Sequence, residues 1–353
     1  MPFVVAVLLA SVCFGTTGAA QALGPDADPV SIGAARILIG GGALALVAAV
    51  MALVRRRRRA DAAAQATPAA RTGTRSTHAA APRHPLAVAL VVAVGALGVL
   101  AYQPAFFAGT AANGVAVGTV VALGSAPVLT GGLDWVLRRR FPGRRWLVAT
   151  AIATIGVAVL AAASDPSHAT ASPLGLLASL GAGASYAVYT LAAKWLLDRG
   201  FTPTGSMGAL FGTAAVVSLP VLLMTDASWL ATGPGLAMAL WLGLVATTLA
   251  YVLFGAGLAG LAPAVVSTLT LAEPLTAGVL GVVVLGETLA PGSVLGLAIL
   301  ALGIVVLASG GCRRAAVASK PWTSSSSPAS GSTPHRGTTS SPSSKSRGTA
   351  PTR

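Results

Sequence analysis

Ten long apolar segments dominate this sequence and leave few folds open to it. A helix needs about 20 apolar residues to cross a hydrocarbon core about 30 Å thick. Only 9% of the 353 residues are charged, against about 25% in a soluble domain. Lipid offers no hydrogen bonds to exposed backbone, and the segments lack the polar alternation of barrel strands, so all ten should be helical. The predicted fold is an all-α integral membrane bundle of ten transmembrane helices, at 3–23, 30–54, 86–104, 113–137, 146–163, 174–197, 204–225, 235–259, 262–286 and 292–309.

The first segment also resembles a secretory signal, because MPFVVAVLLASVCFGTTGAAQA ends in an A-x-A-like triplet. It lacks the Lys or Arg that precedes the apolar run of a signal peptide, so we expect it to stay as a helix, with cleavage as the alternative. The two cysteines, Cys13 and Cys312, offer neither metal spacing nor a disulfide framework. No Gly-rich phosphate loop follows a strand-like segment. We therefore expect no cofactor and no metal.

The basic residues gather on alternate loops. Of the 23 Lys and Arg, 22 lie between segments 2 and 3, between 4 and 5, around the turn after 6, and after 10. By the positive-inside rule these loops are cytoplasmic, which predicts a multi-pass protein of the cytoplasmic membrane with both termini inside the cell. The basic loop 55–85 contains no aromatic residue, which argues against nucleic acid as a partner. The tail 313–353, rich in Ser, Thr and Pro, should be disordered.

An internal repeat divides the membrane region into two halves, 1–163 and 174–309. A shift of 147 residues aligns the stretch from Ala126 with the stretch from Glu273 without a gap, and Pro127 then meets Pro274. Each half holds five helices, so the second half would cross the membrane with opposite polarity. Inverted repeats are a recognised basis of alternating access, with the substrate site near the bilayer midplane between them.

The segments GASYAVYTLAAKWLLDRG and LAEPLTAGVLGVVVLGETL, together with AARILIGG and SAPVLTGGL in the first half, resemble the drug/metabolite transporter superfamily in its EamA-like branch. The resemblance covers about residues 3–309. It implies a ten-helix transporter that exports small metabolites, amino acids or drugs, usually driven by a proton or substrate gradient. Two departures stand out. The loop between the second and third segments is long and basic, and Arg140 replaces the acidic residue often found after the fourth helix.

Glu273 is the residue most in need of explanation, because it is a carboxylate in the middle of an apolar segment. An ionisable residue at such a depth is costly, and by default it indicates function. The matching prolines Pro127 and Pro274 suggest helix kinks that line a cavity, whereas Ala126 takes the place of Glu273 in the first half. We expect Glu273 to couple protons or bind a cation. A structural glutamate that joins helices is the alternative.

Three more residues are candidates for substrate binding or proton coupling. Arg36 lies seven residues into its segment, about 10 Å below the membrane surface. It could bind a substrate carboxylate, pair with an acidic group, or snorkel to the interface. Tyr186 and Tyr189 share one helix face in mid-segment, where their rings could hold a flat or cationic substrate. An interfacial aromatic belt is their alternative role.

The polar residues Gln103 and Asn113 flank the turn expected between the third and fourth segments. Both are candidates for a gate, although helix capping would explain Asn113 equally well. The expected partners are a small-molecule substrate, membrane lipids and a second copy of the chain in a homodimer. No cluster of His, Asp, Glu or Cys gathers at one membrane face, so we do not expect an enzyme. A sensor or scaffold without transport is the alternative, ahead of a lipid-linked transferase.

Overall fold

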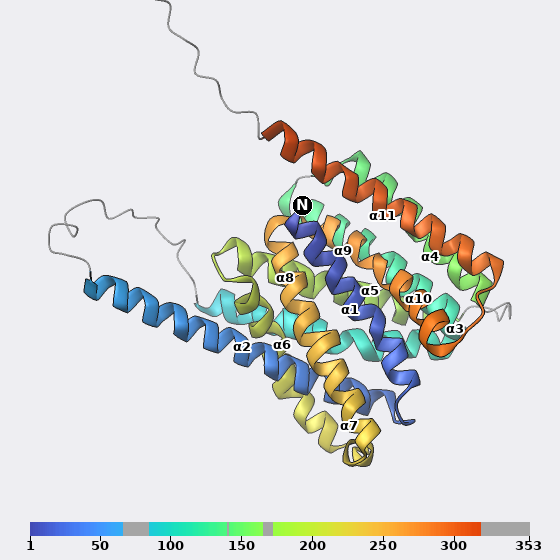
Figure 1. Ribbon diagram of the computed structural model, residues 1–353, viewed down its shortest axis with the longest axis horizontal. Helices are drawn as coiled ribbons and strands as arrows, with labels where there is room; N and C mark the ends of the chain where they lie inside the picture. The colour runs from blue at the N-terminus through green and yellow to red at the C-terminus, as the bar shows by residue number, and fades with distance from the viewer. Residues whose placement is uncertain (66–84, 140, 165–171, 319–353) are drawn as a thin grey trace, which may run out of the picture.

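The structure is a computed structural model, and it describes residues 1–65, 85–139, 141–164 and 172–318 (Figure 1). Throughout these ranges the regular structure is helical. The elements are α1 Pro2–Ala22, α2 Pro29–Gln65, α3 Pro85–Arg138, α4 Arg144–Ser164, α5 Pro173–Asp198, α6 Pro203–Leu223, α7 Gly233–Leu240, α8 Ala250–Gly260, α9 Pro263–Leu269, α10 Glu273–Leu285 and α11 Pro291–Ala318. Three short elements join them: η2 Ser228–Ala231, η3 Trp241–Leu249 and η4 Thr270–Ala272.

Ten helices are long and apolar enough to cross a membrane, as the sequence predicted. Helix α3 supplies two of them, Pro85–Gly114 and Val117–Arg138. The run from α7 through η3 to α8 forms one span, Gly233–Gly260, and α9, η4 and α10 together form another, Pro263–Leu285. The prediction of an all-helical membrane protein with ten spans is confirmed for the described part of the chain.

The turn expected between the third and fourth segments is much shorter in the structure. Helix continues through Gln103 and Asn113, and the backbone departs from helical angles at Gly114, with φ 79° and ψ 158°. The four alanines of AFFAGTAAN favour helix, and Gly114 adopts the positive φ at which the helix breaks. Asn113 therefore borders the turn, as predicted, whereas the prediction that Gln103 flanks it was wrong.

Two helices also extend further than the sequence predicted. Helix α2 continues to Gln65, so residues 55–65 of the predicted basic loop are helical, and α11 continues to Ala318. The remainder of that loop, and residues 319–353 of the predicted tail, lie outside the described residues.

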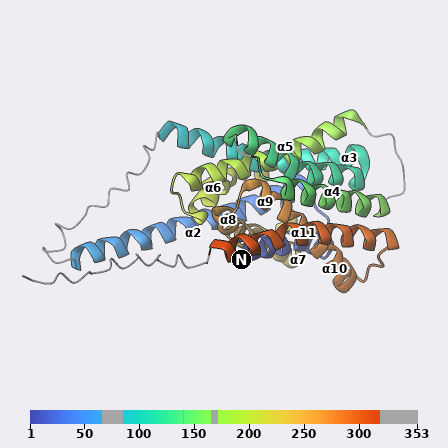
Figure 2. The same cartoon turned by 90° about the horizontal axis from the view of Figure 1, so that it is seen from above.

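The helices pack in pairs that connect the two halves of the chain. Helix α4 runs along α11, α2 along α6, and α3 along α5, while α1 packs against α8 and α10 (Figures 1 and 2). A side chain on Gly156 would collide with the backbone of Leu300, and a side chain on Gly303 would collide with that of Ala153. These four positions are two pairs separated by 147 residues. The α4–α11 contact is thus reciprocal under the shift that relates the predicted repeats.

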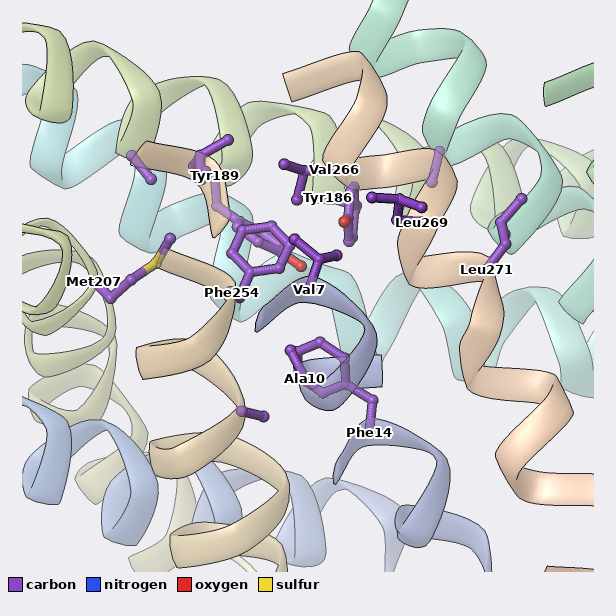
Figure 3. Packing of buried hydrophobic residues seen from close by; sticks show 14 of the residues in the cluster. Val7, Ala10, Phe14, Tyr186, Tyr189, Met207, Phe254, Val266, Leu269 and Leu271 are labelled. Atoms are coloured by element: carbon purple, nitrogen blue, oxygen red, sulfur yellow. The ribbon is translucent and has the colours of Figure 1, made fainter. Parts of the chain in front are cut away.

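The largest core cluster lies where both halves meet. Figure 3 shows Val7 of α1 close to Phe254 of α8, with Tyr186 and Tyr189 of α5 and Leu269 of α9 around them. Val7, Phe254 and Leu269 are fully buried. This packing fixes the broken span of α9, η4 and α10 against α1 and α5, and so sets the position of the residues that follow Leu269.

Candidate functional site

A cavity of about 80 Å³ lies in the middle of the bundle and receives side chains from both halves. It brings together four residues that the sequence singled out: Glu273 of α10, Arg36 of α2, and Tyr186 and Tyr189 of α5. We call it the central cavity. Its full lining is Phe14, Arg36, Tyr102, Leu123, Ala126, Tyr186, Tyr189, Tyr251, Ser267, Thr270, Leu271 and Glu273.

Glu273 stands at a break in its span. The 3-10 turn η4 interrupts the helix at Thr270–Ala272, and Glu273 begins α10 with Pro274 directly after it. The positive end of a helix dipole favours a carboxylate there. Among the described residues, no hydrogen bond or ion pair reaches the Glu273 side chain. The carboxyl group therefore faces the cavity with its bonding capacity unused.

Arg36 lies on α2, and its side chain is hydrogen-bonded to η3 rather than to an acidic group. Its Nε donates to Thr247 Oγ1 at 2.9 Å, and its Nη2 donates to the carbonyl oxygen of Ala246 at 3.0 Å. Both acceptors belong to η3, a π-helical segment in which Thr247 Oγ1 donates in turn to the carbonyl of Leu242, five residues earlier. Arg36 thus lines the cavity without snorkelling to the membrane surface and without pairing with Glu273. Stretches of π-helix of this kind are frequent at functional sites.

The tyrosines form one connected aromatic wall. Tyr186 Oη lies 2.9 Å from Thr270 Oγ1, and Tyr189 Oη lies 3.2 Å from Tyr251 Oη. The rings of Tyr186 and Tyr189 have centroids 5.1 Å apart and meet edge to face, as do those of Tyr189 and Tyr251 at 6.0 Å. The wall combines apolar faces with hydroxyl groups, which suits a ligand that carries both an apolar and a charged part.

Gln103 and Asn113 occupy two different places. Gln103 lies on α3 beside Gly33 of α2 and lines a smaller cavity of about 60 Å³ together with Arg36. Asn113 is buried at the helix break, where its Oδ1 accepts from the backbone N–H of Ser172 at 2.6 Å and its Nδ2 donates to the carbonyl of Ser172 at 3.2 Å. Asn113 therefore ties α3 to the start of α5. The two residues do not form a common gate in this structure.

The two predicted kink prolines also differ in setting. Pro127 lies within the continuous helix α3, next to the cavity residue Ala126, whereas Pro274 follows the 3-10 break of η4. The helix is thus more strongly interrupted at Pro274 than at Pro127, next to the carboxylate of Glu273.

Sequence reasoning missed half of the aromatic wall. The chain has four tyrosines, and all four line the central cavity, but only two were selected from the pattern of α5. Tyr102 and Tyr251 are single tyrosines on their own helices, so no helical spacing marked them. Tyr251 lies in the middle of its predicted segment 235–259, which could have marked it. Tyr102 lies near the end of the predicted segment 86–104 and is in mid-span only because the helix continues to Gly114.

Taken together, the central cavity can hold a proton or a cation at Glu273 and can offer aromatic faces and hydroxyls to an organic ligand. Within the described ranges, no group of three or more His, Cys, Asp or Glu side chains is placed to hold a metal ion.

Comparison with known proteins adds three findings. The model of the EamA-like transporter family matches residues 1–162 and 173–309. A protein of Bacillus subtilis (strain 168), named the uncharacterized transporter YwfM, is 38% identical over 304 residues, which cover 86% of this chain and 92% of that protein. A solved structure titled "Crystal structure of protein" matches this chain with a TM-score of 0.66 at 19% identity. The match covers 89% of this chain and 98% of that one, and it shows a similar fold.

Proposed function

The chain belongs to the EamA-like transporter family, and from this premise we propose that it is a secondary active exporter. It moves a small metabolite, amino acid or drug across the cytoplasmic membrane by alternating access, and Glu273 carries the proton or cation that drives the step. Both termini lie in the cytoplasm, as the distribution of Lys and Arg indicates.

The unpartnered carboxyl group of Glu273 carries this proposal. A charged residue in mid-membrane is normally paired or faces an aqueous or ligand cavity, and it marks a substrate or ion pathway. Glu273 faces a cavity, and Arg36 in the same cavity is bonded to Thr247 and Ala246 instead. A purely structural glutamate would be expected to bond to a neighbouring helix. Glu273 is free to exchange a proton or a cation with the ligand.

The reciprocal packing of the two halves supports alternating access. Two pairs of residues separated by 147 positions, Leu123 with Thr270 and Ala126 with Glu273, line the central cavity together. A cavity built from equivalent positions of two halves lies near their pseudo-twofold axis. In inverted-repeat transporters the substrate site lies at such a repeat interface and becomes accessible from one side and then the other.

The test is a transport assay in proteoliposomes that contain a pH-sensitive dye. Addition of a transported metabolite, amino acid or amine should move protons across the wild-type membrane, and Glu273→Gln should abolish this movement. Glu287→Gln is the matched control, because Glu287 follows the end of α10 and does not line the central cavity. Proton movement that persists in Glu273→Gln and disappears in Glu287→Gln would overturn the assignment.

A further inference from the structure

A second cavity, of about 150 Å³, lies between α2, α3 and α6 at the membrane side opposite the N-terminus. It is lined by the first turns of α2 and the last turns of α6, and its walls are almost entirely apolar. Val30 and Val217 line it and are 44% and 47% exposed. Because both residues belong to membrane spans, this cavity opens sideways toward the bilayer. We call it the lateral cavity.

A third, smaller cavity lies between the lateral cavity and the central cavity. A connecting cavity of about 60 Å³ shares Ile37, Val99 and Gln103 with the lateral cavity. At its other end it shares Arg36, Tyr102, Tyr189 and Tyr251 with the central cavity. The three spaces thus adjoin one another in series, from the carboxylate site to the lipid-facing surface of α2 and α6, and we call this series the path.

Two polar side chains along the path form no hydrogen bond with other described residues. Ser218 is 2% exposed and lines the lateral cavity, and Gln103 stands where the lateral and connecting cavities meet. No hydrogen bond joins either side chain to another described residue. Pro104 also lines the lateral cavity and has no N–H to give to the carbonyl of Leu100, one helical turn earlier. Unsatisfied polar groups at membrane depth are costly, so a ligand with polar atoms should pass along this path.

We propose that the three cavities form one extended site for an amphipathic amine, with the ammonium group beside Glu273 and the apolar chain in the lateral cavity. The inference rests on the proposed function of the central cavity and names the substrate class. An ammonium group fits because no ion pair within the described residues engages Glu273, and four tyrosines surround the space. An apolar chain fits because the lateral cavity is apolar and open to lipid, into which the substrate leaves.

Gly33 lines the lateral cavity beside Gln103. A side chain on Gly33 would collide with the carboxamide of Gln103, at the point where the connecting and lateral cavities join. A side chain on Gly42, nine residues further along the same helix, would meet nothing within 4 Å. The pair Gly33→Leu and Gly42→Leu therefore separates closure of the path from the general effect of a leucine on α2.

The experiment uses purified protein in lipid nanodiscs and two probes, methylammonium and a dodecylammonium with a photoreactive diazirine at the end of its chain. Protection of Glu273 from a carbodiimide reports binding of the ammonium group. Photolabelling mapped by mass spectrometry reports the position of the chain. Val99 is the diagnostic residue because it is only 5% exposed. Val216 of α6 is 73% exposed and lines none of the three cavities, so it is the internal reference for probe dissolved in the bilayer.

We expect both amines to protect Glu273, and the dodecyl probe to label Val99. Gly33→Leu and Glu273→Gln should each lower the ratio of Val99 to Val216 labelling by at least about tenfold, equivalent to about 1.4 kcal/mol, and Gly42→Leu should leave it unchanged. Protection of Glu273 with labelling confined to Val216, or Val99 labelling that persists in Glu273→Gln, would overturn the extended site and leave the proposed function standing. Failure of both amines to protect Glu273 would overturn the amine as substrate class, while the transport assay still decides the function.

Discussion

Ala126 and Glu273 are separated by 147 residues in the sequence and line the same cavity, one from each half of the chain. The repeat thus places an alanine and a carboxylate at equivalent positions around one space. If the halves are related by a pseudo-twofold axis, a carboxylate should reach the ligand from either position. Function would then depend on one acidic group in the cavity rather than on the identity of the helix that carries it.

This relationship predicts the result of moving the carboxylate. Glu273→Ala should abolish ligand-induced thermal stabilisation, and the double variant Ala126→Glu/Glu273→Ala should restore part of it, because both positions line the cavity. The midpoint of thermal unfolding, with and without ligand, measures this. A double variant that behaves like Glu273→Ala at every ligand concentration would contradict the equivalence.

The position of Arg36 should depend on the hydroxyl of Thr247. Thr247→Val removes the acceptor of the Arg36 Nε hydrogen bond and leaves the bond to the Ala246 carbonyl. A hydrogen bond to a charged group contributes about 1.5–3 kcal/mol, so we expect ligand affinity to change by at least about tenfold, measured by calorimetry. Thr248→Val is the control, because the Thr248 hydroxyl bonds to the carbonyls of Gly40 and Gly243 and not to Arg36. Equal effects of the two substitutions would contradict this role.

The close contact of α4 with α11 predicts matched losses of stability. Gly156→Ala and Gly303→Ala each place a Cβ against backbone of the facing helix, and overpacking of this kind costs about 1–3 kcal/mol. Both variants should lower the thermal midpoint in nanodiscs by similar amounts. Gly132→Ala, where a Cβ meets nothing within 4 Å, should leave it unchanged or raise it. A loss in one glycine variant alone would show that the contact is not reciprocal.

A hydroxyl clamp holds the connection between α6 and α7. Ser31 Oγ donates to the carbonyl of Asp226 at 2.8 Å and accepts from Trp229 Nε1 at 2.9 Å. Ser31→Ala leaves both groups without this partner, at a cost of about 1–3 kcal/mol each, and should accelerate amide hydrogen exchange across residues 226–231. The control is Thr225→Val, whose hydroxyl donates to the carbonyl of Leu222 at the end of α6 and not to Ser31. Unchanged exchange in Ser31→Ala would contradict the clamp.

The ten apolar segments of the sequence predicted the ten spans. Exposing polar backbone to lipid is so costly that segments of this length and composition cross a membrane as helices. The end of the third span could not be predicted. Residues 105–113 carry no charge. Charge and hydropathy therefore did not show where in this stretch the third span ends, and the helix continues to Gly114. The π-helical form of η3 also has no mark in the sequence WLGLVATTL.

Sequence reasoning found those residues of the candidate site that carry a charge inside a membrane span, because charged side chains are rare there. Glu273 and Arg36 were identified on this ground, and the structure places both in the central cavity. Tyr251 was missed because periodicity shows which face a residue occupies but not which helix faces it. The lateral cavity lay beyond sequence reasoning for the same reason, since it needs α2, α3 and α6 side by side.

The most direct test of the central claim compares wild-type protein with Glu273→Gln in a screen for thermal stabilisation by metabolites, amino acids and amines, over about three pH units around neutrality. We expect at least one ligand to stabilise the wild type in a pH-dependent manner and to leave Glu273→Gln unaffected. Equal and pH-independent stabilisation of both proteins would contradict the account and make Glu273 a structural residue.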